Sequence, residues 1–203
     1  MLDGGVGQEI YLRAGKPAHP MWSVQVMMEQ PDLVKVVHKD FIRAGASVVT
    51  INSYTCTPTR LSRDGAPSQF INLQKQAATL AAQARKELGP MATEVQIAGC
   101  LPPLVASYTT DERSFATLKQ EYEQIVAVQE PLVDVFPIET ISSSKEARAA
   151  IEAALPSGKS ICLSFTLCDT HPHLLRSTKP LRLRSCLPTE AAMRGNSFCM
   201  HSV

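Results

Sequence analysis

The alternation of two kinds of apolar segment limits the fold of this chain more than any other feature. Short runs rich in β-branched residues, typical of buried strands, occupy 47–52, 95–100, 132–140 and 160–167. Between them, apolar residues recur every three or four positions, which predicts helices over 31–45, 68–88, 114–129 and 143–156. Strands that alternate with helices predict a parallel sheet with helical crossovers.

The spacing of the expected strand ends indicates which parallel fold this is. The ends lie near Asp3, Asn52, Gly99, Glu139 and Phe165, at an average step of about 40 residues. Eight such units would need roughly 320 residues, which lies within the range of a (β/α)8 barrel with insertions. We therefore expect an α/β fold that is a partial (β/α)8 TIM-type barrel, with about five β/α units present.

Composition and charge exclude several classes of partner. The 20 basic and 19 acidic residues give a net charge of +1, so nothing favours nucleic acid or an anionic membrane as a partner. No apolar run is long enough to cross a bilayer, and the N-terminus lacks the pattern of a secretory signal. We expect a cytoplasmic protein. Its six cysteines form no CxxC pair, which favours reduced, buried thiols.

Polar residues at the expected strand ends predict a binding site for a small zwitterion. In parallel α/β folds, ligands bind at the carboxyl ends of the strands. A carboxylate at the fourth end suits an ammonium group, and exposed amides after the first end suit a carboxylate. The candidate substrate-binding residues are Asp3, Gly4, Gly5, Asn52, Tyr54 and Glu139.

Each candidate has a purely structural alternative, which the sequence leaves open. Asp3 before two glycines is also typical of a turn, and Tyr54 is also typical of a packed side chain. Glu139 at a strand end also suits helix capping or a surface ion pair. The glycines at Gly5 and Gly7 are too few for a dinucleotide-binding fingerprint.

The histidines give no metal site by spacing. His38 falls near the polar side of an expected helix, so we expect a solvated side chain. His171 and His173 follow Cys168 and Asp169 in a proline-bearing stretch, but this spacing matches no established zinc pattern.

Several stretches in order from Leu2 to about Leu181 resemble the homocysteine S-methyltransferases, particularly the shorter branch that uses S-methylmethionine or S-adenosylmethionine. They read LDGGVGQEIYLRAG, MWS, VHKDFIRAGASVVTINSYT, AGCLPPLVASY and IETISSSKEA. The resemblance implies a zinc-bearing (β/α)8 barrel. In such an enzyme the homocysteine thiol binds zinc as a thiolate and accepts a methyl group from a sulfonium donor, giving methionine.

The resemblance also assigns roles to the candidate residues. Asp3, Gly4, Gly5 and Glu139 match the amino-acid pocket of the family, and Asn52 and Tyr54 line the same mouth. The implied partners are homocysteine and a sulfonium methyl donor. The matched positions include no residue to which we assign a catalytic role.

The family's zinc ligands have no counterpart in this sequence. The resemblance implies three zinc cysteines, one after the sixth strand and an adjacent pair near the eighth, whereas this chain has no adjacent cysteine pair. Zinc is thus expected for the family, but its ligands are absent here, and we assign no metal ligand.

This pattern suggests a truncated member of the family. We expect an incomplete homocysteine-binding barrel domain over 1–181 and an irregular or disordered tail over 182–203. The unpaired first and fifth strands would favour self-association. The expected function is that of a homocysteine S-methyltransferase-type protein, inactive in this form. The alternative is a non-catalytic partial barrel that binds an amino acid or a partner.

Overall fold

The structure, a computed structural model, describes residues 1–64 and 66–167, together with the backbone of 198–202. The chain divides into two units. The first comprises Met1–Cys100 and Val128–Asp134, and the second comprises Leu101–Ala127 and Val135–Val203. Within the described residues, no helix combines the length and apolar character needed to cross a bilayer.

The first unit contains a short parallel ladder and most of the helices. Strand β1 pairs with strand β2, with Val49 opposite Ile97, and Leu2 forms an isolated parallel bridge to Val48. The first expected strand is therefore present as this bridge. The elements of the unit are α1 (Val6–Ala14), α2 (Trp22–Glu29), α3 (Pro31–Arg43), β1 (Val48–Thr50), α4 (Pro58–Arg63), η1 (Pro67–Gln69), α5 (Phe70–Glu87), η2 (Gly89–Ala92), β2 (Gln96–Ala98) and η3 (Glu130–Leu132).

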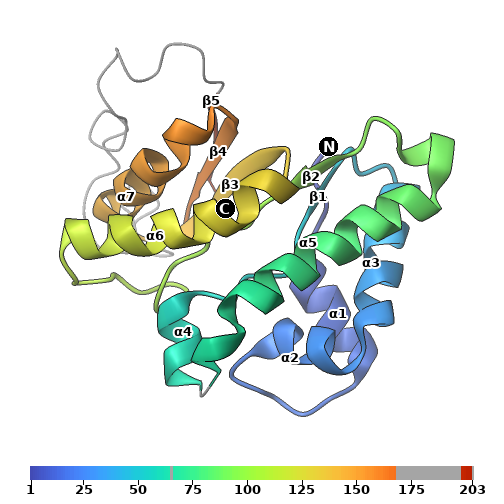
Figure 1. Cartoon of the computed structure of the whole chain (residues 1–203), viewed down its shortest axis with the longest axis horizontal. Helices are drawn as coiled ribbons and strands as arrows, with labels where there is room; N and C mark the ends of the chain where they lie inside the picture. Colours follow the sequence, from blue (N-terminus) through green and yellow to red (C-terminus); the bar gives the residue numbers. More distant parts are fainter. Residues whose placement is uncertain (65, 168–197, 203) are drawn as a thin grey trace. The chain divides into compact units, whose positions relative to one another are not determined.

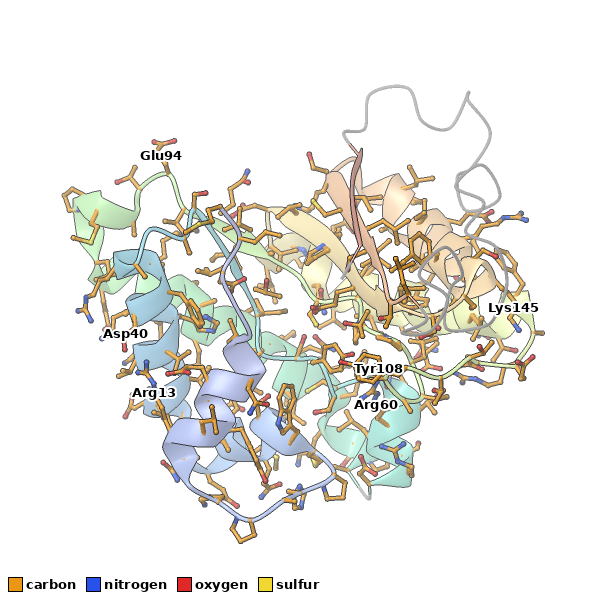
Figure 2. All side chains as sticks on the ribbon, turned by 180° about the vertical axis from the view of Figure 1, so that it is seen from behind. Arg13, Asp40, Arg60, Glu94, Tyr108 and Lys145 are labelled. Carbon is orange, nitrogen blue, oxygen red and sulfur yellow. The ribbon has the colours of Figure 1, made fainter. Side chains whose placement is uncertain are left out.

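The helices of this unit pack against one another through their apolar side chains. Helix α3 contacts both α5 and α1, and α1 also contacts α2, as Figure 1 shows. Pro31 occupies the first turn of α3, where its missing N–H costs nothing. At the surface, Arg13 of α1 donates to the carboxylate of Asp40 on α3 at 2.6 Å (Figure 2).

The second unit is built on a parallel ladder of three strands. Strand β3 pairs with β4 and β4 pairs with β5, while Leu101 forms an isolated bridge to Ile138. Helix α7 packs against β3 and β4, and the Ser143 hydroxyl caps it by accepting from the amide of Glu146. The elements are α6 (Phe115–Gln129, whose last two residues belong to the first unit), β3 (Val135–Ile141), α7 (Ser144–Ala154), η4 (Leu155–Ser157), β4 (Ser160–Phe165) and β5 (Phe198–Ser202).

The prediction of an irregular tail is wrong for the five residues of β5. This strand lies within the predicted tail and runs parallel to β4, with Leu163 opposite Met200. A run of five residues is too short for a pattern of apolar residues to be recognised in the sequence. The strand forms because its backbone hydrogen-bonds to the edge of β4. The expectation that the fifth strand is unpaired is therefore also wrong. Self-association stays a prediction, and 182–197 lie outside the described residues.

The prediction of a solvated His38 is wrong as well. Its side chain is completely buried, because it shares the buried face of α3 with Val34 and Ile42, four residues before and after it. Within residues 1–64 and 66–167, neither ring nitrogen has a hydrogen-bond partner. Burial without a partner lowers the pKa of His38 to about 4. The imidazole is thus neutral in the folded protein at neutral pH.

Replacing His38 by leucine is expected to reduce the acid sensitivity of the fold. In the unfolded chain His38 binds a proton below about pH 6.5, whereas in the folded chain it does so only near pH 4. The wild type should therefore lose stability as the pH falls from 6.5 to 4. The contribution of this residue is roughly 2–3 kcal/mol. Urea unfolding at pH 7.5 and 4.5 measures it, and an unchanged pH dependence in His38→Leu would refute this assignment.

Candidate functional site

Asp3 holds the start of the chain on strand β1. Its carboxylate accepts the backbone N–H of Thr50 at 2.6 Å and the Thr50 hydroxyl at 3.0 Å. Its own N–H donates to the carbonyl of Val48 at 3.0 Å. Burial raises the pKa of Asp3 to about 6, against the lowering effect of the bonds from Thr50. Both carboxylate oxygens accept hydrogen bonds from Thr50, so Asp3 fixes the position of Gly4 and Gly5, which follow it.

The glycines after Asp3 lead into the N-terminus of α1. Gly4 and Gly5 are exposed, and Gly5 is the N-cap residue of the helix without a side-chain cap. The first amides of a helix have no partner within it and carry partial positive charge, so they attract anions. A Cβ on Gly4 would lie 3.0 Å from the Phe41 ring, so a side chain here would require that ring to shift by a few tenths of an ångström.

Gly7 is required by the close approach of α1 and α2. A Cβ at this position would lie 2.5 Å from Cζ3 of Trp22 and 2.9 Å from Oγ of Ser23. The second glycine of the Gly5–Gly7 pair therefore serves helix packing, and the structure gives it no phosphate-binding role.

Asn52 fixes the segment that carries Trp22. Its buried amide accepts the Ser23 hydroxyl at 2.7 Å and donates to the Ser23 carbonyl at 3.0 Å. The Thr55 hydroxyl donates to the carbonyl of Met21 at 2.8 Å. Between these bonds Trp22 adopts a φ of 46°, a conformation that is uncommon for a bulky residue and persists only where its surroundings enforce it.

Trp22 and Tyr54 form a cluster of aromatic rings with a basic neighbour. The ring of Trp22 meets the ring of Tyr54 edge-on at 6.3 Å and that of Tyr11 at 6.5 Å. The guanidinium of Arg60 lies 5.2 Å from the centre of the Tyr54 ring. Trp22 and Arg60 are not among the residues that the sequence predicts for the site, although Trp22 lies within the MWS stretch.

Glu139 lies in the second unit at a bulge in β3. Ile138 pairs with Leu163 and Ile141 pairs with Phe165, so Glu139 and Thr140 together oppose one residue of β4. The Glu139 side chain is half-buried, and its N–H donates to the carbonyl of Leu101 at 3.2 Å. Because Ser143 caps α7, the alternative that Glu139 caps this helix does not apply.

The structure thus gathers five of the six predicted residues in the first unit. Asp3, Gly4 and Gly5 stand on or beside the ladder that contains β1, and Asn52 and Tyr54 follow the same strand. Glu139 belongs to the second unit.

A buried acidic group in the second unit had no counterpart among the predicted site residues. Glu146 is fully buried, and its Oε1 accepts the N–H of Leu104 at 3.0 Å and the hydroxyl of Tyr122 at 3.3 Å. Burial raises the pKa of Glu146 to about 7, with a further increase from the charge of Asp111. In the sequence, Glu146 follows Ser143 at the spacing of a capping box, and this pattern does not indicate a buried acid.

The described residues do not fit a zinc site. No group of three or more histidine, cysteine, aspartate or glutamate side chains within 1–64 and 66–167 is arranged to hold a metal ion. Burial raises the pKa of the Cys56 thiol, which keeps it protonated and unsuited to coordination. Cys168, Asp169, His171 and His173 lie outside the described residues.

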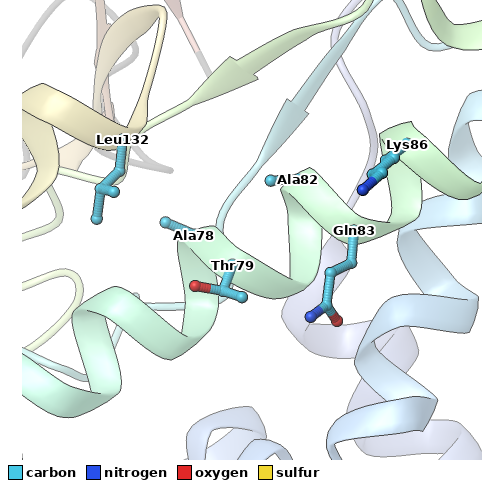
Figure 3. Close-up of a pocket in the computed structure, with 6 residues that line it drawn as sticks. All are labelled: Ala78, Thr79, Ala82, Gln83, Lys86 and Leu132. Carbon is cyan, nitrogen blue, oxygen red and sulfur yellow. The ribbon is translucent and has the colours of Figure 1, made fainter.

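A shallow groove on the outer side of α5 is separate from these residues. It has a volume of about 230 Å³ and is lined by two alanines, a threonine, a leucine and two longer polar side chains (Figure 3). None of the predicted site residues contributes to it. Its lining residues are Ala78, Thr79, Ala82, Gln83, Lys86 and Leu132.

Comparisons with known proteins agree on one family. The family model described as homocysteine S-methyltransferase matches residues 1–187. The homocysteine S-methyltransferase of Escherichia coli is 30% identical over 196 residues, which cover 90% of this chain and 62% of that protein. Homocysteine S-methyltransferase 1 of Brassica oleracea is 23% identical over 218 residues, covering 98% of this chain and 66% of that protein. This chain thus spans less than two thirds of the length of both relatives.

Solved structures give the same result. The metallated form of the homocysteine methyltransferase MmuM from Escherichia coli aligns with a TM-score of 0.77 and 27% identity, over 96% of this chain and 69% of that one. The oxidized form aligns with a TM-score of 0.79 and 27% identity, over 96% and 68%. This similarity, together with the parallel pairing of the strands, confirms the predicted partial (β/α)8 barrel.

Proposed function

Because this chain belongs to the homocysteine S-methyltransferase family, we propose that it binds homocysteine at the carboxyl ends of its strands. The reaction we propose for the complete enzyme is transfer of a methyl group from a sulfonium donor to the homocysteine thiol, which gives methionine.

The observation that carries the proposal is the anchored start of α1. Asp3 is fixed to Thr50 by two hydrogen bonds, and the uncapped N-terminus of α1 follows directly after Gly4 and Gly5. Apart from the Val6 amide, which donates to the Gly4 carbonyl at 2.8 Å, the first amides of α1 suit the α-carboxylate of an amino acid. Within the second unit, Glu139 matches the amino-acid pocket by the resemblance, and its carboxylate suits an ammonium group.

The aromatic cluster suits the methyl donor. A sulfonium ion is a cation with apolar substituents, and the faces of tryptophan and tyrosine attract such cations. Trp22 and Tyr54 provide two rings in contact, and Asn52 and Thr55 fix the backbone beside them. We propose that the Trp22 ring receives the donor and that Asn52 acts by positioning it, because the Arg60 guanidinium already lies over the Tyr54 ring.

We also propose that this chain binds homocysteine without transferring a methyl group by itself. A free thiol with a pKa of about 8.5 is mostly protonated at neutral pH, so methyl transfer needs a group that deprotonates it. The described residues form no zinc site, and the sequence has no adjacent cysteine pair of the kind the resemblance implies. The sulfonium leaves as a neutral thioether, so the reaction does not demand a general acid.

Replacing Glu139 by glutamine is expected to weaken homocysteine binding about tenfold, because the ammonium group loses its charged partner. Binding of 4-sulfanylbutanoate, which lacks the amino group, should not change. Calorimetric titration of the full chain measures both affinities. The matched control is Glu123→Gln, which removes an exposed carboxylate that pairs with Lys119.

Two results would contradict the proposal. One is an equal loss of affinity for both ligands in Glu139→Gln. The other is a wild-type chain without affinity for homocysteine, which would favour the alternative of a module that binds another partner.

A further inference from the structure

The bulge in β3 places Glu139 in a way that a regular strand would not. Between the pairs Ile138–Leu163 and Ile141–Phe165, the bulged strand has one residue more than its partner. Ser164 is thus the single residue of β4 that faces both Glu139 and Thr140. A bulge of this kind bends the strand and changes the direction of the side chains on it.

The extra residue adopts a conformation that needs support. Thr140 has a φ of 61°, in the left-handed region that a β-branched side chain rarely adopts. A bulge also interrupts the ladder and leaves backbone groups of the bulged strand without their usual partners. Both features persist only where neighbouring groups enforce them.

Ser164 supplies the missing hydrogen bonds. Its hydroxyl accepts the N–H of Thr140 at 3.4 Å and donates to the carbonyl of Ile138 at 3.5 Å. These bonds are long, but they reach the residues on both sides of Glu139 from one side chain. On its other side, Glu139 donates its N–H to Leu101 at 3.2 Å. Hydrogen bonds with Ser164 and with Leu101 therefore fix the backbone around Glu139.

The side chains of this region divide between two faces. Ile138 and Ile141 of β3 and Leu163 and Phe165 of β4 are all buried. Glu139 and Ser164 are half-buried, so the bulge keeps the apolar residues on the buried face and leaves Glu139 partly exposed. A one-residue shift without a bulge would exchange these faces.

We propose that Ser164 is a positioning residue that, with Thr140, holds the Glu139 carboxylate in the orientation that receives the ammonium group of homocysteine. The inference rests on the proposed function, because it assigns Ser164 a role in that same site. Ser164 acts through the backbone of β3 and does not itself contact the ligand.

The test compares Ser164→Ala with Ser164→Thr in the full chain, since threonine keeps the hydroxyl. Alanine should weaken homocysteine binding about fivefold and leave 4-sulfanylbutanoate binding unchanged, and threonine should restore it. In the Glu139→Gln background, Ser164→Ala should have no further effect, since the two residues act as one unit. Ser160→Ala, on the same strand away from the bulge, is the matched control.

A second readout needs no ligand. Hydrogen exchange at the Thr140 amide should accelerate about tenfold in Ser164→Ala and return to the wild-type rate in Ser164→Thr, while amides of α7 keep their rates. Unchanged exchange at Thr140, or parallel loss of affinity for both ligands, overturns the positioning role. Accelerated exchange in a chain whose wild type does not bind homocysteine would instead overturn the proposed function, and with it the ligand-orienting part of this inference.

Discussion

Replacing Gly7 by alanine should destabilise the first unit by about 1–3 kcal/mol, the usual cost of overpacking a closely packed contact. The new Cβ would lie 2.5 Å and 2.8 Å from the outer ring atoms of Trp22 and 2.9 Å from Oγ of Ser23. Neither neighbour can move freely. Ser23 bonds to Asn52 through both its hydroxyl and its carbonyl, and the Trp22 ring lies between two tyrosines.

Trp22 itself reports the outcome of this substitution. It is the single tryptophan of the chain, so its fluorescence during urea unfolding measures the stability of the variant at the ring that meets the new Cβ. Gly5→Ala is the matched control, because its Cβ would lie 3.5 Å from Cβ of Gln8, an ordinary contact, and its φ is −71°. Equal stability of the two variants would show that α1 and α2 do not approach as closely as described.

Replacing Glu146 by glutamine should remove a loss of stability that the wild type shows as the pH rises. The pKa of Glu146 is about 7 in the folded chain and near 4.5 when unfolded, so the folded state holds its proton more tightly. Its contribution is fully present below pH 4.5 and is lost as the pH rises through 7. Between pH 5 and 8 the wild type should lose about 2–3 kcal/mol from this residue, whereas Glu146→Gln should not.

The difference between the two proteins isolates Glu146 from other titrating groups. Asp3, whose pKa is about 6, contributes a change of the same sign to both proteins, and His38 contributes the opposite sign to both at acidic pH. A buried amide in place of the carboxylate also shifts the stability at every pH, so the slope is the diagnostic quantity. Glu152→Gln on the same helix, which removes a pair with Arg148, should keep the wild-type slope. A parallel slope in Glu146→Gln would contradict the assignment.

Most of the helices and strands can be predicted from the sequence, because their apolar residues either recur at the spacing of a helix or form a continuous run. The strands of the predicted runs lie within or close to the ranges 47–52, 95–100, 132–140 and 160–167, since continuous apolar runs need cover on both faces. Three helices, α1, α2 and α4, were not predicted. They are short and bounded by glycine and proline, so tertiary packing rather than local pattern determines them.

The candidate site residues can be named from the sequence, but their geometry cannot be predicted from it. Strand ends can be read from one strand at a time, and they indicate Asp3, Asn52 and Glu139. The bulge at Glu139 depends on the register between β3 and β4, and the φ of Trp22 depends on bonds from Asn52 and Thr55. Such contacts join residues far apart in the chain, which no local pattern records.

The most direct test of the account is a calorimetric titration of homocysteine into the full 203-residue chain after treatment with a metal chelator. We expect saturable one-site binding with a Kd below about 1 mM, weakened about tenfold by Glu139→Gln. A chelated chain that shows no saturable binding of homocysteine would contradict it.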